Sequence, residues 1–291
     1  MDYNITFPQQ TITYINGSGI LMISIIFVIG FILYKRYAAK FMPGLMGILA
    51  FLMLGIVGTE LITLLLSAIP GINRLLYNSA VAFCITRALV FAVLIHVTKI
   101  LVLKFADMSS NMELGDALMG GLGIAIGQAV VSGMDFMYIS SIGSAINQNG
   151  VEQFLVDVSA EEAESLLEYI YKTIEIPPMF FLLKGFNCTL DIVFTVITCL
   201  FIYAIVKKGL SSVWHVILIV STTMVQLVSL LGDYGVSSNY FILSALKLLI
   251  VIVTVIMAFR IYAEYLAGEF RSFEKLKKKK SMPKFNYVKN K

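Results

Sequence analysis

The segment from Asn239 to Ala263 reads NYFILSALKLLIVIVTVIMAFRIYA, and its only charged side chains are Lys247 and Arg260. A helix of roughly 20 apolar residues is long enough to cross the hydrocarbon core of a bilayer, which is about 30 Å thick. In that core every backbone amide must find its hydrogen bond within the protein, and a helix meets this condition by itself. The segment therefore predicts a membrane-spanning helix.

Six further apolar runs of similar length precede this segment. They cover residues 18–35, 44–68, 79–104, 116–145, 178–206 and 212–231. The composition agrees, because 58% of the residues are hydrophobic, 14% are charged and the mean hydropathy is +0.87. Such a chain has too few polar residues to cover a surface that faces water. We predict an all-α polytopic transmembrane helix bundle of about seven spans in the cell membrane, with the lipid bilayer as its immediate partner.

The basic residues that flank these runs predict the orientation of the bundle, since lysines and arginines collect beside the cytoplasmic ends of spans. They follow the first, third, fifth and seventh runs: Lys35, Arg36, Lys40, Lys104, Lys207, Lys208 and the cluster from Lys277 to Lys280. The N-terminus is therefore predicted to lie outside and the C-terminus in the cytoplasm.

We predict a single domain over residues 1–264, followed by a basic cytoplasmic tail over residues 265–291. The net charge of +4 resides mainly in this tail. We interpret the tail as a determinant of topology that also attracts anionic lipid headgroups, rather than as a nucleic-acid site. No nucleic-acid partner is expected.

Two segments on the predicted outer side differ from the spans. Residues 147–177 are acidic, and Ser159 and Glu162 have the spacing of a capping box, so an amphipathic helix is predicted there. The alternative is a loop that packs on nothing. Pro178 suits the first turn of the next span. The stretch from Ile69 to Asn78 is interpreted as a loop, and the glycine-rich fourth run is expected to tilt or break.

Ionisable side chains at membrane depth are costly, so each is a functional candidate. Apart from the histidines, they are Glu60, Arg87, Lys99, Asp135, Asp191 and Lys247. Asp191 is expected to pair with Lys99 or Lys247, because a buried charge normally needs a partner. Lys247, like Lys184 and His215, is close enough to a span end to extend toward the interface. Interhelical ion pairs that hold the bundle in register are the alternative explanation for each of these residues.

The sequence carries no standard soluble-enzyme motif, neither HExxH nor a P-loop nor GxSxG. Its two histidines, His96 and His215, lie on different spans and cannot supply the three protein ligands of a catalytic zinc site. No metal and no cofactor are expected.

Two neighbouring spans carry a recognisable pattern. Residues 94–105 read LIHVTKILVLKF, and residues 116–129 read DALMGGLGIAIGQA. The pattern resembles the YhfC-like glutamic-type intramembrane proteases, which are relatives of the CAAX-protease-like membrane peptidases. That family has a Glu-Glu-x-x-Arg motif on one span, and Asp-Ala-Leu followed by Gly-His-Gly-Gly-x-Glu-Ala on the next. The framework of the second motif is present here.

The resemblance implies that the catalytic side chains themselves have been replaced. Ile95 and His96 stand at the two glutamate positions of the first motif, and Lys99 stands at its arginine. In the second motif Ile124 replaces the histidine and Gln128 the glutamate. A weaker match in the fifth span puts Asp191 at a histidine position. These six positions would mark a cavity that has lost its proteolytic chemistry, provided that His96, Gln128 and Asp191 converge.

Three functions remain open. The first is a non-catalytic relative of these proteases that binds a transmembrane or lipidated partner in the former active-site cavity. The second is a permease-like transporter whose charged residues line a path to both sides of the membrane. The third is a hydrolase with altered chemistry, in which His96 is the base and Asp191 orients it.

Overall fold

A computed structural model describes residues 5–109, 112–156, 158–237 and 239–267, and this part of the chain is entirely helical. The C-terminal cluster of lysines lies outside the described residues. The elements are α1 (Gln9–Tyr37), α2 (Met42–Ala50), the π-helical η1 (Phe51–Gly58), α3 (Thr59–Ser67), α4 (Pro70–Asn78), α5 (Ala80–Ser109), α6 (Leu114–Asn149), α7 (Val151–Leu155), α8 (Ala160–Glu175), α9 (Pro178–Lys208), α10 (Val213–Asp233), α11 (Tyr240–Ile261) and the π-helical η2 (Tyr262–Leu266).

Seven helical stretches within the described residues are long and apolar enough to cross a membrane. They are Gln9–Tyr37, Met42–Ser67, Ala80–Met108, Leu114–Asn149, Pro178–Lys208, Val213–Asp233 and Tyr240–Leu266. The second consists of α2, η1 and α3 in succession, and the seventh of α11 and η2. The prediction of a seven-span, multi-pass membrane protein is confirmed, and the first span begins earlier than the apolar run at residue 18 suggested.

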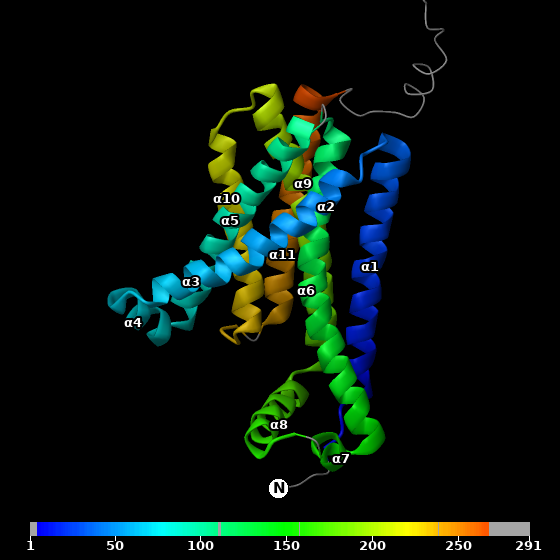
Figure 1. The fold of residues 1–291 in the computed structure, drawn as a ribbon, viewed down its shortest axis with the longest axis vertical. Helices are drawn as coiled ribbons and strands as arrows, with labels where there is room; N and C mark the ends of the chain where they lie inside the picture. The colour runs from blue at the N-terminus through cyan, green and yellow to red at the C-terminus, as the bar shows by residue number, and fades with distance from the viewer. Residues whose placement is uncertain (1–4, 110–111, 157, 238, 268–291) are drawn as a thin grey trace, which may run out of the picture.

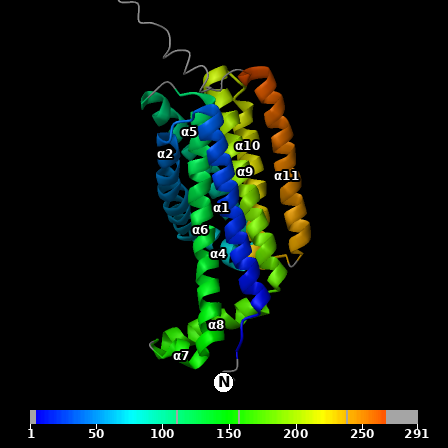
Figure 2. The same cartoon turned by 90° about the vertical axis from the view of Figure 1, so that its right-hand side faces the viewer.

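Helices α6 and α9 form the centre of the bundle. Within their most apolar windows, 56% and 61% of the residues are buried inside the protein, against 17% to 33% for the other five spans. They pack against each other and against α1, while α2 lies on α6, α11 lies on α9, and α5 pairs with α10 (Figures 1 and 2). These two helices are therefore the ones that are mostly covered by protein, although part of α6 remains exposed.

Glycines set the closeness of α2 and α6. A Cβ atom on Gly123 would overlap the carbonyl of Gly44, and one on Gly47 would overlap the carbonyl of Gly120. The two backbones are therefore in direct contact, which is the role of small residues between membrane helices. This contact fixes the start of the second span, whereas α3 leans away from α6 toward the edge of the molecule (Figure 1).

The two ends of the bundle differ in charge. Lys35 and Arg36 occupy the last turn of α1, and Lys207 and Lys208 the last turn of α9. Both turns lie at the top of Figure 1, which we call the basic end. The opposite end, called the far end, carries α4, α7 and α8. By the distribution of lysine and arginine, the basic end is the predicted cytoplasmic side.

Helices at the far end correct two local predictions. The stretch predicted as a loop from Ile69 contains α4, because Pro70 at the first helical position favours a helix start. The fourth run, expected to tilt or break, is one helix of 36 residues without a break. The acidic segment forms two helices, α7 and α8, instead of one. The Ser159 cap is confirmed, since its hydroxyl accepts from the Glu162 backbone N–H and donates to the Glu162 carboxylate.

Candidate binding cavity at membrane depth

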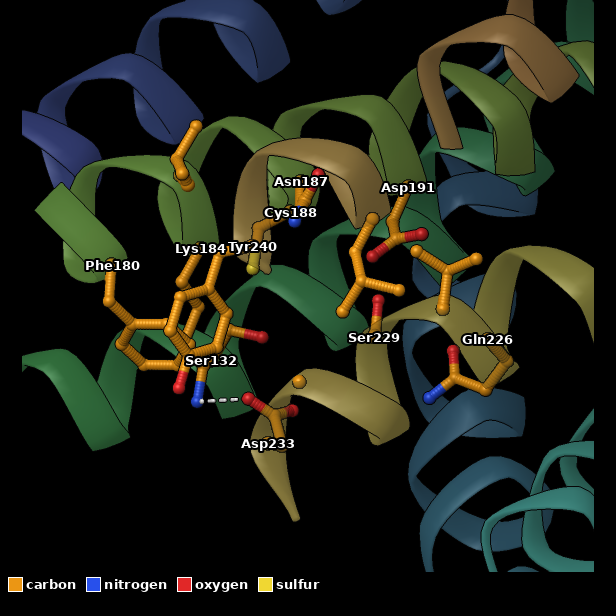
Figure 3. Close-up of a pocket in the computed structure, with 14 residues that line it drawn as sticks. Ser132, Phe180, Lys184, Asn187, Cys188, Asp191, Gln226, Ser229, Asp233 and Tyr240 are labelled. Atoms are coloured by element: carbon orange, nitrogen blue, oxygen red, sulfur yellow. Dashed lines mark ion pairs between the residues drawn. The ribbon is translucent and has the colours of Figure 1, made fainter. Parts of the chain in front are cut away.

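Two adjacent cavities lie in the far half of the bundle. The larger has a volume of about 280 Å³ and is bordered by η1, α3, α5, α6, α9 and α10, and the smaller has about 110 Å³ and reaches α11 (Figure 3). They share the side chains of Ser132, Lys184, Asp191, Gln226 and Asp233. These residues come from the far halves of their helices, which places both cavities in that half of the bundle.

Ion pairs and a hydrogen bond between α9, α10 and α11 hold the cavity walls together. Lys247 of α11 donates to Asp191 of α9 at 2.7 Å and to the hydroxyl of Ser229 of α10 at 2.7 Å. Nζ of Lys184 lies 3.1 Å from Oδ1 of Asp233, and a dashed line in Figure 3 marks this ion pair. The expectation that Lys247 extends to the interface is wrong: its side chain is 0% exposed, because α11 turns it inward onto Asp191.

The larger cavity contains a third ion pair and, among the described residues, one acid without an ion pair. Arg87 of α5 pairs with Glu60 of α3. Asp135 of α6 also lines this cavity and is exposed, and among the described residues it has neither a hydrogen bond nor an ion pair. Among the acids of this wall in the described part of the chain, Asp135 alone lacks an ion pair. Lys184, which already pairs with Asp233, attracts Asp135 from beyond ion-pair distance.

A chain of hydrogen bonds leads from the cavity into the core of the bundle. Gln128 lines the larger cavity and accepts from the hydroxyl of Thr195 at 2.9 Å. Thr198 donates to the Thr195 carbonyl at 3.0 Å and accepts from the buried ammonium of Lys99 at 2.6 Å. Lys99 also lies over the ring of Phe194. Lys99 therefore lies behind the wall of the cavity and does not pair with Asp191.

The two histidines form a separate pair. Nε2 of His96 lies 2.8 Å from Nδ1 of His215, with the rings edge to face. Neither histidine belongs to the lining of the two cavities. Of the three positions whose convergence the resemblance requires, Gln128 and Asp191 thus border one cavity, while His96 is engaged elsewhere.

Ile95 and Ile124 pack together where the resemblance implies a glutamate and a histidine. Both are fully buried in one apolar cluster with Phe51 and Val102. Phe51 also borders the larger cavity. The apolar cluster therefore closes the cavity on the side of the basic end.

Three residues of this site were not predicted from the sequence. Asp233, Gln226 and Ser132 line both cavities but were not named as candidates. Asp233 is the last residue of α10 and reads in the sequence as part of a loop. A hydrophilic serine or glutamine in an apolar run gives little signal of its own, since it can also bond to the backbone of its own helix.

The seven-span fold and these cavities define a multi-pass helical membrane protein with a polar, ion-paired cavity at membrane depth. Residues 20–247 match the family model of the YhfC intramembrane metalloproteases, and the chain belongs to this family. Comparisons with curated proteins and with solved structures give no match. The family is thus described by metal-dependent chemistry, whereas the sequence resemblance implied a glutamic-type mechanism.

The side chains in the described part of the chain do not fit a catalytic metal ion. Among the described residues, no three histidine, cysteine, aspartate or glutamate side chains lie close enough together to hold one. Catalytic zinc sites use three protein ligands and keep a fourth position for water. His96 and His215 together supply two nitrogen ligands, and the motif positions at Ile95 and Ile124 are apolar.

Proposed function

We propose that this chain is a non-catalytic member of the YhfC family that binds a membrane-embedded partner in its polar cavity. The observation that carries the proposal is the contrast between two neighbouring groups of family positions. Gln128 and Asp191 line a polar cavity, while Ile95 and Ile124 lie in the apolar cluster that adjoins it through Phe51.

The chemistry of the replacing side chains supports this function. Peptide hydrolysis needs a group that accepts and returns a proton, or a metal ion that activates water. Isoleucine has no titratable group, and glutamine forms hydrogen bonds but does not act as a base at neutral pH. Asp191 has a carboxylate, but this carboxylate is already paired with the ammonium group of Lys247.

The alternatives fit the geometry less well. A hydrolase that uses His96 as base needs this ring beside the cavity, but His96 bonds to His215. A transporter needs a path that reaches both ends of the bundle, but the apolar cluster around Phe51 separates the larger cavity from the basic end. Binding requires neither feature.

Zinc content and proteolysis test the proposal together. The full-length protein, purified in detergent and dialysed against micromolar zinc, is expected to retain well below one zinc per chain by plasma mass spectrometry. His96→Ala and His215→Ala variants should give the same value. In liposomes the protein should leave membrane-spanning peptides intact by mass spectrometry. One zinc per chain that is lost in His96→Ala, or cleavage that a chelator stops, would overturn the proposal.

A further inference from the structure

The far half of α6 presents an apolar face to the outside of the bundle. Val131, Met134 and Tyr138 are exposed there, and Met134 is 65% exposed. Spacings of three and four residues place these side chains on one side of a helix. Asp135 lies on the same side, so the face is apolar with one carboxylate within it. Such a face has the pattern of a helix-packing surface with one polar contact.

The depth of Asp135 follows from the contacts of α6 with α1. Ser140 donates to Asn16 at 3.0 Å, and the apolar run of α1 begins two residues later at Ser18. Asp135 precedes Ser140 by five residues, which is about 7 Å along a helix at 1.5 Å per residue. Asp135 therefore lies inside the apolar layer near its far edge, where an ionised carboxylate that faces lipid is unfavourable by several kcal/mol without a partner, on the order of 2.5 or more at the centre.

Among the described residues, Asp135 is the one acid of the larger cavity without an ion pair, and Lys184, which attracts it from beyond ion-pair distance, is already paired with Asp233. The carboxylates of Glu60, Asp191 and Asp233 are each paired with a cation of the chain. A second polar group in the same wall is the buried hydroxyl of Thr59, whose residue is 4% exposed. This hydroxyl has no hydrogen-bond partner among the described residues. One negative charge and one free hydroxyl thus border the same space. They match a ligand that brings a positive charge and several N–H donors.

We propose that this face binds a membrane-spanning helix of another protein that carries a lysine or arginine near its extracytoplasmic end, with that basic side chain paired to Asp135. The inference rests on the proposed function and names the chemistry of its partner. Val131, Met134 and Tyr138 contact the apolar side of the partner helix, and the cation enters the larger cavity between α3 and α6. A lipid ammonium group would lie in the headgroup layer, outside the depth of Asp135.

Host peptides with one movable lysine test this pairing. The full-length protein, with photoreactive benzoylphenylalanine in place of Met134, is reconstituted in phosphatidylcholine vesicles with leucine-alanine helices that span the bilayer. One peptide has its lysine about five residues inside its far end, and the matched peptide has the same composition with the lysine at the equivalent depth of the basic end. Crosslinking of the first peptide should exceed that of the second by about fivefold, the effect of one interhelical polar contact in a membrane.

Variants locate the effect at Asp135. Asp135→Asn should remove the preference and Asp135→Glu should keep it. Asp135→Lys should transfer the preference to a glutamate peptide. Because Asp135 forms no hydrogen bond or ion pair among the described residues, these variants should elute as the parent does in gel filtration. Benzoylphenylalanine in place of Phe27 of α1, which is 73% exposed, should crosslink both peptides equally.

The outcomes separate this inference from the proposed function. Equal crosslinking of both peptides, or a preference that survives Asp135→Asn, overturns the pairing even if the protein binds no zinc. Loss of the preference in vesicles that contain phosphatidylethanolamine assigns the face to a lipid ammonium group and also overturns it. Cleavage of a crosslinked peptide overturns the non-catalytic function but leaves the pairing in place.

Discussion

Replacement of Lys247 by methionine should destabilise the bundle strongly. The Lys247 ammonium is fully buried and bonds to Asp191 and Ser229 at 2.7 Å each. Methionine preserves most of the side-chain length but removes the charge, so the Asp191 carboxylate loses its cation. Removal of one partner from a buried ion pair costs about 3–5 kcal/mol. Asp191 is 22% exposed and borders both cavities, where water can solvate it, so we expect the lower value, about 3 kcal/mol.

Equilibrium unfolding in mixed lipid and detergent micelles, followed by circular dichroism during titration with dodecyl sulfate, measures this change. The matched variant is the double substitution Asp191→Asn with Lys247→Met, which leaves no buried charge at the site. The double variant should be more stable than Lys247→Met alone, because the second change removes the unpaired carboxylate. If the effect of methionine were purely steric, the losses of stability of the two single variants would add in the double variant.

The reasoning is refuted if Lys247→Met unfolds at the same dodecyl sulfate fraction as the parent protein. It is also refuted if the double variant loses the sum of the two single losses. Either result would mean that the Asp191 carboxylate does not depend on Lys247 for its stability in the bundle.

Three further predictions concern the same bundle. Lys99→Met should be neutral or stabilising in that titration, because Lys99 bonds to the Thr198 hydroxyl and leaves no carboxylate unpaired when removed; a loss as large as that of Lys247→Met would contradict this. Gly123→Ala should prevent recovery of folded protein in gel filtration, because its Cβ meets the α2 backbone, whereas Gly133→Ala, with nothing within 4 Å, should fold normally. Ser159→Ala should destabilise α8 by about 1 kcal/mol, seen as faster hydrogen exchange of its first turn with unchanged exchange in α9.

Hydropathy predicted the spans because a bilayer imposes a single strong condition on each of them. The seven apolar runs correspond to the seven helical stretches, and Pro178 begins α9 as its position suggested. Helix ends were less predictable. The first span begins at Gln9, well before its apolar run, because the early turns of α1 pack against protein, as the burial of Ile12 and Ile15 shows.

The polar residues of the site were partly predictable. Glu60, Arg87, Asp135 and Asp191 were named from their cost at membrane depth and Gln128 from the family pattern, and all five line the larger cavity. The partner of each could not be read from the sequence. Asp191 had two lysines within plausible reach, and only the packing of α11 on α9 selected Lys247. The packing of α10 on α5 likewise brings His96 to His215 and not to the cavity.

The sequence by itself determined the class of protein, because apolar length and the distribution of lysine and arginine are local properties of each span. It also located the family pattern in the third and fourth spans, where the resemblance implies polar residues at the positions of Ile95 and Ile124. Tertiary structure alone decided which side chains meet. Ion pairs and cavities depend on the rotation of each helix about its axis and on the direction in which α3 leans away from α6. The hydropathy of a single span fixes neither the rotation nor the direction.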